Sequence, residues 1–200
     1  MLIAFEGPDE TGKSTSAQNL AWSAGTIYNA NKDNYAQAQA DVAEFPDAVI
    51  TFDRIDWLTH MVYRLSLPGF EWNDDRVRTV FAMPDTHLVL KTHRLTGEGQ
   101  LAAKVEAVGE GYQSGNLDTV TQTYYHFTDW LAAMNQMRDF SLFKTISVME
   151  VHHNQETGEF TQRLVVFSAP GFPWGTQYEK LVHDDESLLE LLRYADQHIG

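Results

Sequence analysis

Residues 7–14 have the side-chain types and the spacing needed to bind a polyphosphate. The run reads Gly7-Pro8-Asp9-Glu10-Thr11-Gly12-Lys13-Ser14, which is the P-loop pattern of two glycines five positions apart followed by Lys and Ser. Backbone N–H groups of such a loop, the positive end of the next helix and the Lys13 ammonium would together hold the phosphates. The Ser14 hydroxyl would ligate the accompanying Mg²⁺. The expected phosphate-binding residues are Gly7, Glu10, Thr11, Gly12, Lys13, Ser14 and Thr15.

Asp53 and Arg54 form the second group of residues that could do chemistry. They follow the apolar run 48–52, which is typical of a buried strand. The carboxyl ends of parallel strands line the crevice in which α/β proteins bind ligands. Asp53 could then hold Mg²⁺ through water, and the planar fork of Arg54 could bind a phosphate. The alternative interpretation is a surface ion pair at a strand-to-helix turn.

Strands and helices alternate around these two motifs. The pattern predicts strands at 1–6, 25–29, 48–52 and 87–90 and helices at 14–22, 35–44, 55–65, 75–81 and 117–137. This order predicts an α/β fold of the P-loop NTPase type, a three-layer sandwich with a mainly parallel sheet flanked by helices. The length of 200 residues favours one domain.

The second half of the chain contains an added β-hairpin within 145–168. Two β-rich runs meet there at a turn around Thr157 and Gly158. The adjacent His152 and His153 would point to opposite faces of a strand, which is poor geometry for a shared metal ion.

Three further segments have weaker patterns. The segment 92–118 is polar and glycine-rich, so it is either a mobile lid over the site or an irregular connection. A short strand is expected at 178–182. Residues 184–187 then cap a final helix at 188–198.

The composition excludes several functional classes. A formal net charge of −14 disfavours nucleic acid as a partner. The sequence contains no run of 18 apolar residues, so no membrane span is expected. No signal-peptide pattern precedes the first strand. The chain has no cysteine, which fits a reducing compartment. We therefore expect a protein of the cytoplasm, the host's cytoplasm if the chain is viral.

The two motifs together resemble the thymidylate kinase family, and more broadly deoxynucleoside monophosphate kinases of bacteriophage type. The resemblance is carried by residues 5–15, by residues 49–54 and by Pro84-Asp85 before the strand around 88–90. The P-loop alone is typical of a whole superfamily. The resemblance is narrowed to this family by two features, the acid Asp9 at the third loop position and the Asp-Arg pair at a strand end.

The resemblance implies ATP as the phosphate donor, Mg²⁺ as the cofactor and a deoxynucleoside monophosphate as the acceptor, with dTMP or a related pyrimidine favoured. Ser14 and Asp53 would serve the metal. Asp9 would contact the acceptor's sugar hydroxyl or orient an arginine, and Arg54 would bind the acceptor phosphate. Thr59 and Tyr63, in the helix after Asp-Arg, would shape the acceptor pocket.

Two departures from the family pattern change these expectations. Family members usually carry a catalytic arginine in the loop or the lid, but here the loop position is Glu10 and segment 95–118 has only Lys104 as a cation. We therefore expect Arg94 to be the main lid-side cation, although three other arginines could fold toward the site, namely Arg76, Arg78 and Arg138. The segment between the second and third strands lacks arginine, so the base pocket would be built from residues such as Trp57, Tyr63, Trp72 or Arg76.

The expected function is phosphorylation of a deoxynucleoside monophosphate in nucleotide biosynthesis, with Lys13, Asp53, Arg54 and Arg94 as catalytic residues. A deoxynucleoside kinase is one alternative, but it needs a carboxylate near the end of the second strand, where the chain has no acid before Asp33. A nucleotide-binding module without transferase activity is the other. The sequence leaves the oligomeric state open, and a homodimer is compatible with it.

Overall fold

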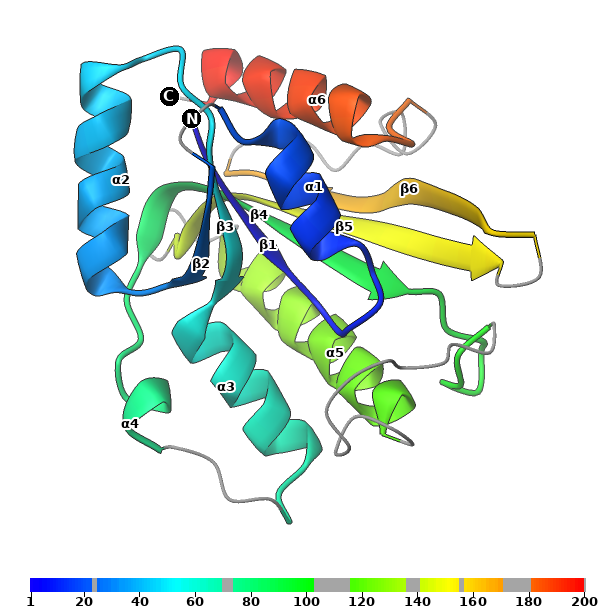
Figure 1. The fold of residues 1–200 in the computed structure, drawn as a ribbon. Helices are drawn as coiled ribbons and strands as arrows, with labels where there is room; N and C mark the ends of the chain where they lie inside the picture. The colour runs from blue at the N-terminus through cyan, green and yellow to red at the C-terminus, as the bar shows by residue number, and fades with distance from the viewer. Residues whose placement is uncertain are drawn as a thin grey trace.

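A six-stranded sheet forms the centre of the protein (Figure 1). The computed structural model describes residues 1–22, 25–69, 74–102, 116–135, 141–154, 157–170 and 181–199. The strands are β1 (Leu2–Glu6), β2 (Thr26–Ala30), β3 (Ile50–Ile55), β4 (Met83–His93), β5 (Phe143–Asn154) and β6 (Glu159–Ser168). Their order across the sheet is β2-β3-β1-β4-β5-β6. Among the six described strands, only β6 runs antiparallel to its neighbour, so the predicted mainly parallel sheet is confirmed.

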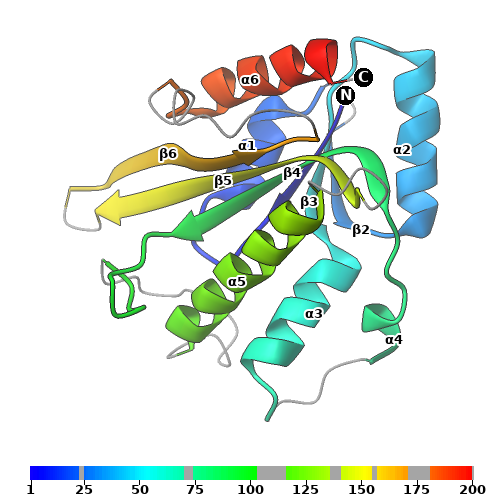
Figure 2. The same cartoon turned by 180° about the vertical axis from the view of Figure 1, so that it is seen from behind.

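Helices flank this sheet on both faces, as the alternation of strands and helices predicted. The helices are α1 (Lys13–Leu20), α2 (Lys32–Glu44), α3 (Asp56–Ser66), α4 (Asp74–Val77), α5 (Leu117–Asn135) and α6 (Asp185–His198). Helices α1 and α6 lie together on one face, and α3 and α5 lie on the other (Figures 1 and 2). Within the described ranges, no helix is long and apolar enough to cross a membrane.

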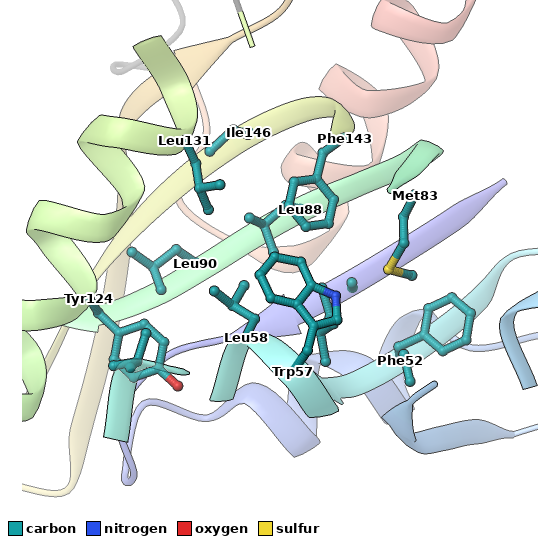
Figure 3. Close-up of a cluster of buried hydrophobic side chains, with 14 of the residues drawn as sticks. Phe52, Trp57, Leu58, Met83, Leu88, Leu90, Tyr124, Leu131, Phe143 and Ile146 are labelled. Atoms are coloured by element: carbon teal, nitrogen blue, oxygen red, sulfur yellow. The ribbon is translucent and has the colours of Figure 1, made fainter. Parts of the chain in front are cut away.

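Two hydrophobic cores separate the sheet from its helices. Side chains alternate along β1, so that Leu2 and Ala4 belong to one core whereas Ile3 and Phe5 belong to the other. The first core lies under α2, α3 and α5, and Trp57 there stacks on Phe143 with ring centroids 6.4 Å apart (Figure 3). The second core lies under α1 and α6. Burial on both sides explains why β1 is almost continuously apolar.

Several strands are longer than the sequence pattern predicted. β3 continues through Asp53 to Ile55 because Asp53 still pairs with Phe5 of β1 and Ile55 with Ala30 of β2. β4 begins before and ends after the predicted 87–90 because it pairs with β1 on one side and β5 on the other. Asp53 and Arg54 therefore lie within the last residues of a strand rather than after it.

Other boundaries also differ from the prediction. α2 begins at Lys32 because Asn31 and Asn34 form a capping box. α4 is shorter than the predicted 75–81, and the Thr79 hydroxyl donates to the Arg76 carbonyl in the turn that follows it. The expected strand at 178–182 is wrong for its described residues, 181 and 182, which are not in a strand.

The hairpin and the final helix follow their predictions closely. β5 and β6 pair antiparallel from Ile146 and Ser168 to Asn154 and Glu159. Asp184 caps α6 by accepting from the Ser187 backbone N–H. The predicted lid at 92–118 begins within β4 and ends within α5, and its residues 103–115 lie outside the described part of the chain.

Candidate functional site

The candidate site lies at the carboxyl ends of β1 and β3, which are neighbours in the sheet. The chain leaves β1 for α1 on one face and leaves β3 for α3 on the opposite face (Figure 1). Adjacent parallel strands whose connections separate in this way open a crevice where α/β proteins bind ligands. The loop of residues 7–12, which joins β1 to α1, lies at this crevice.

Glycines allow the 7–12 loop to pack against the sheet. Gly7 has a φ of +138°, and a Cβ built there would lie 1.9 Å from the Lys91 carbonyl oxygen of β4. Gly12 has a φ of +73° and occupies the N-cap position of α1, where it offers no side chain to cap the first N–H groups. Those N–H groups and the helix dipole therefore provide an environment for an anion.

Ser14 and Asp53 are in contact at these strand ends. The Ser14 hydroxyl donates to Oδ2 of Asp53 over 2.6 Å, which joins α1 to β3. Asp53 is buried, and within the described residues its other oxygen, Oδ1, has no hydrogen-bond partner. A buried carboxylate oxygen without a partner is costly, and a divalent cation would relieve that cost. The pair therefore fits the predicted Mg²⁺ position.

Arg54 and Asp9 form an ion pair beside the same loop. The guanidinium of Arg54 also donates to the Gly7 carbonyl oxygen over 3.4 Å. Arg54 has a φ of +76°, an uncommon conformation for a residue with a side chain, and such strain concentrates at functional sites. Its planar donor fork could exchange the Asp9 carboxylate for a phosphate.

Lys13 begins α1 and folds back onto the 7–12 loop. Its ammonium donates to the Pro8 carbonyl oxygen over 2.5 Å and lies 3.4 Å from the Thr11 hydroxyl. Only 5% of the residue is exposed. Burial, followed by the nearby positive charge of Arg54, lowers the pKa of Lys13 to about 7. Asp9, Glu6 and Asp53 act in the opposite direction, and a bound polyphosphate would add further negative charge beside this ammonium.

Glu6, which the sequence analysis did not single out, connects the 7–12 loop to neighbouring elements through hydrogen bonds. Its fully buried carboxylate accepts hydrogen bonds from the Gly7 and Ile55 N–H groups and from the Thr59 and Tyr124 hydroxyls. These four donors come from the loop, β3, α3 and α5. The carboxylate therefore ties together the elements that form the crevice, as fully satisfied buried polar groups do.

The predicted acceptor residues occupy different environments. Thr59 donates to Glu6, and Tyr63 is buried in α3. Trp57 does not line the crevice, because its ring lies in the core against Phe143 (Figure 3). Arg76 contacts Asp56 and His60, which lie in the first turns of α3. Trp72, Lys104 and Arg138 lie outside the described residues.

Arg94 lies beyond the end of β4, as predicted, and its side chain is exposed. It lines a pocket of about 360 Å³ together with Glu150, His152 and Arg163 of the hairpin. Arg163 in turn pairs with Glu150. The structure thus groups Arg94 with the β5–β6 hairpin, and its proposed action on a transferring phosphoryl group stays a prediction.

Lys91 and His93 of β4 approach the 7–12 loop from the face of α1 and α6. Lys91 donates to the Ser16 hydroxyl over 2.6 Å and lies 3.5 Å from the Gly12 carbonyl oxygen. A ring nitrogen of His93 lies 2.8 Å from the Asp9 carbonyl oxygen, and burial lowers the pKa of His93. The sequence analysis did not single out Lys91 or His93. Their position directly after the predicted strand at 87–90 was the signal that could have identified them.

No protein-family model matches this chain, and no curated protein matches its sequence. Within the described residues, no group of three or more His, Cys, Asp or Glu side chains is placed to hold a metal ion. That result is compatible with Mg²⁺ bound to a nucleotide, because such an ion takes most of its ligands from phosphates and water and needs one or two protein groups.

Proposed function

We propose that this protein is an ATP-dependent deoxynucleoside monophosphate kinase of the P-loop class. The Ser14–Asp53 pair is the observation that carries the proposal. It places a hydroxyl and a buried carboxylate oxygen without a described partner beside Lys13, at the start of a helix and at the end of a glycine-containing loop. This combination suits a magnesium nucleoside triphosphate.

We assign the donor and the acceptor to different sides of the site. The uncapped N-terminus of α1 and the Lys13 ammonium would hold the β- and γ-phosphates of ATP. Arg54 lies on the β3 side and would bind the acceptor phosphate after releasing Asp9. The acceptor proposed from the resemblance is dTMP or a related pyrimidine monophosphate.

The reaction requires the protein to position the two substrates and to supply positive charge beside the transferring phosphoryl group. An oxygen of the acceptor phosphate forms a bond to the γ-phosphorus as the bond from that phosphorus to the bridging oxygen of ADP breaks, so ADP leaves and a nucleoside diphosphate forms. The acceptor oxygen is already anionic, so no general base is needed. Ser14 and Asp53 would hold Mg²⁺, which neutralises charge on the phosphates when bound. Lys13 and Arg54 keep the reacting groups aligned.

A coupled assay of ADP release tests this function. The purified protein would be supplied with MgATP and, separately, with each of the four deoxynucleoside monophosphates and each of the four deoxynucleosides. We expect turnover with one or two monophosphates and none with nucleosides. Turnover only with nucleosides would instead identify a deoxynucleoside kinase. ATP binding without turnover on any acceptor would identify a nucleotide-binding module.

The lowered pKa of Lys13 predicts that ATP binding takes up a proton. Near pH 8 the free Lys13 is mostly neutral, since its pKa is about 7, and the bound phosphates raise that pKa again. Binding should therefore take up clearly more protons at pH 8 than at pH 6. Calorimetry of MgATP binding in buffers of different ionisation enthalpy measures this number.

Lys91 needs a control in that experiment, because burial also lowers its pKa, to about 8. The Lys91→Met variant should keep most of the proton uptake if Lys13 is its source. Uptake that is the same at pH 6 and pH 8 would contradict the assignment to Lys13.

A further inference from the structure

A second and larger pocket opens directly beside the 7–12 loop. It has a volume of about 740 Å³, within the range of small-molecule sites. One wall is formed by Gly12, Thr15 and Asn19 of the loop and α1, another by Phe160 of β6, and the third by the first turn of α6 around Asp185. The pocket therefore continues from the proposed phosphate position away from the acceptor side of the crevice.

Phe160 of β6 lines this pocket. It is 44% exposed, although it packs close to the loop, since a Cβ built on Gly12 would lie 3.2 Å from its ring. The Lys91 ammonium lies 5.5 Å from the ring centroid, and the His153 ring lies 6.2 Å away at an interplanar angle of 60°. The β5–β6 hairpin thus places the Phe160 ring next to Gly12, in the loop that would hold phosphate.

A hydrogen-bond network around Asp185 joins the walls of the pocket. The Asp185 carboxylate accepts hydrogen bonds from the Ser16 hydroxyl over 2.7 Å and from the Gln162 amide over 3.0 Å. It also forms an ion pair with Lys91 over 3.8 Å. These contacts connect α1, β4, β6 and α6, so the pocket walls are held relative to one another before any ligand arrives.

The rim of the pocket is acidic, with Glu10, Asp184 and Glu186 all exposed there. Carboxylates repel a phosphate but accept hydrogen bonds from hydroxyl and amino groups. The pocket therefore suits the uncharged end of a nucleotide, a sugar and base with donor groups, while the 7–12 loop suits the charged end. An aromatic face supplies stacking for the base.

We propose that the pocket between α1, the β5–β6 hairpin and α6 binds the nucleoside part of the donor triphosphate, with the base stacked on Phe160. This inference rests on the proposed function, since it assumes that the triphosphate occupies the 7–12 loop. It gives the hairpin a role in donor binding, and it places the acceptor on the opposite side of the loop, beside Arg54.

Binding of MgATP and of magnesium tripolyphosphate to Phe160 variants tests the inference. Tripolyphosphate has the phosphates of the donor but no base. The affinity of the Phe160→Ala variant for ATP should fall by at least about 10-fold, because loss of an aromatic stacking partner has that order of effect. Its affinity for tripolyphosphate should stay within about 2-fold of wild type, since the loop contacts remain. The Phe160→Tyr variant should bind both ligands as wild type does.

Two controls separate stacking from support of the loop. Phe160→Leu keeps apolar bulk against Gly12 but has no ring, so it should lose ATP affinity selectively. Phe45 is a matched aromatic, 47% exposed at the end of α2, and Phe45→Ala should leave both affinities unchanged.

The outcomes distinguish this inference from the function on which it rests. Equal losses of ATP and tripolyphosphate affinity in Phe160→Ala, or no loss of either, would overturn the stacking role and leave the proposed kinase standing. A wild-type protein that binds neither ligand would overturn both.

Discussion

The Lys13→Ala protein is expected to keep its fold and to lose most of its phosphoryl transfer, by about 10²-fold or more in kcat. Lys13 stands at the first position of α1 with its ammonium directed into the 7–12 loop. A cation there would stabilise charge that develops as the terminal phosphoryl group leaves ADP. The fold should tolerate the change because burial of the ammonium is already unfavourable, as the lowered pKa of Lys13 shows.

Steady-state kinetics and circular dichroism measure the two halves of this prediction. Lys32→Ala is the matched control, because Lys32 also begins a helix but is exposed at the edge of the sheet. It should have normal turnover. A folded Lys13→Ala protein that keeps more than about half of the wild-type kcat would remove the phosphate-binding assignment of the loop, since transition-state cations have far larger effects.

The parts of the site that the sequence predicted are those with local patterns. The strand, loop and helix around Gly7 to Ser14 are contiguous, and their glycine spacing and apolar flanks require no knowledge of the tertiary fold. The position of Asp53 and Arg54 beside that loop also followed from one rule, that parallel strand ends share an edge. The structure confirms the sheet on which both inferences depend.

The parts that the sequence missed depend on partners far along the chain. Glu6 reads as the last residue of an apolar strand, and its role is visible only when Thr59 and Tyr124, the second of them 118 residues away, reach its carboxylate. Phe160 reaches Gly12 only through the register of β5 and β6. Trp57 was assigned to a base pocket because of its type, whereas its position in the first turn of α3 turns it into the core.

The described contacts define the proposed donor side of the site in more detail than the proposed acceptor side. The 7–12 loop, α1, the β5–β6 hairpin and α6 converge around one pocket, whose walls are held by the hydrogen bonds of Ser16 and Gln162 to Asp185. On the proposed acceptor side the polar groups include Arg54, Asp9 and the Glu6 network. Variants of Arg54 therefore give the sharpest information about the proposed acceptor, and variants of Asp53 provide the contrast at the proposed metal position.

Arg54→Ala should act on the acceptor and leave the donor nearly untouched. Loss of a charge-assisted phosphate contact is worth about 2 kcal/mol, so kcat/KM for the monophosphate should fall about 30-fold, through both a higher KM and a lower kcat. ATP affinity should change little, because Lys13 and the α1 N-terminus remain. Arg78→Ala is the matched control, since Arg78 is exposed and pairs only weakly with Asp75 three residues earlier.

Asp53→Asn should act on the metal instead. The amide keeps the size of the side chain and an oxygen that can accept from Ser14, but it places an NH₂ group where the carboxylate offered a second oxygen. We expect the Mg²⁺ concentration for half-maximal turnover to rise about 10-fold, with a smaller effect on the KM of the monophosphate, because hard cations depend on charged oxygen ligands. Titration of each variant with Mg²⁺, ATP and monophosphate measures the contrast. Small and equal effects of both substitutions on all three would mean that Asp53 and Arg54 only join β3 to the loop, because a structural pair has no reason to separate metal from acceptor.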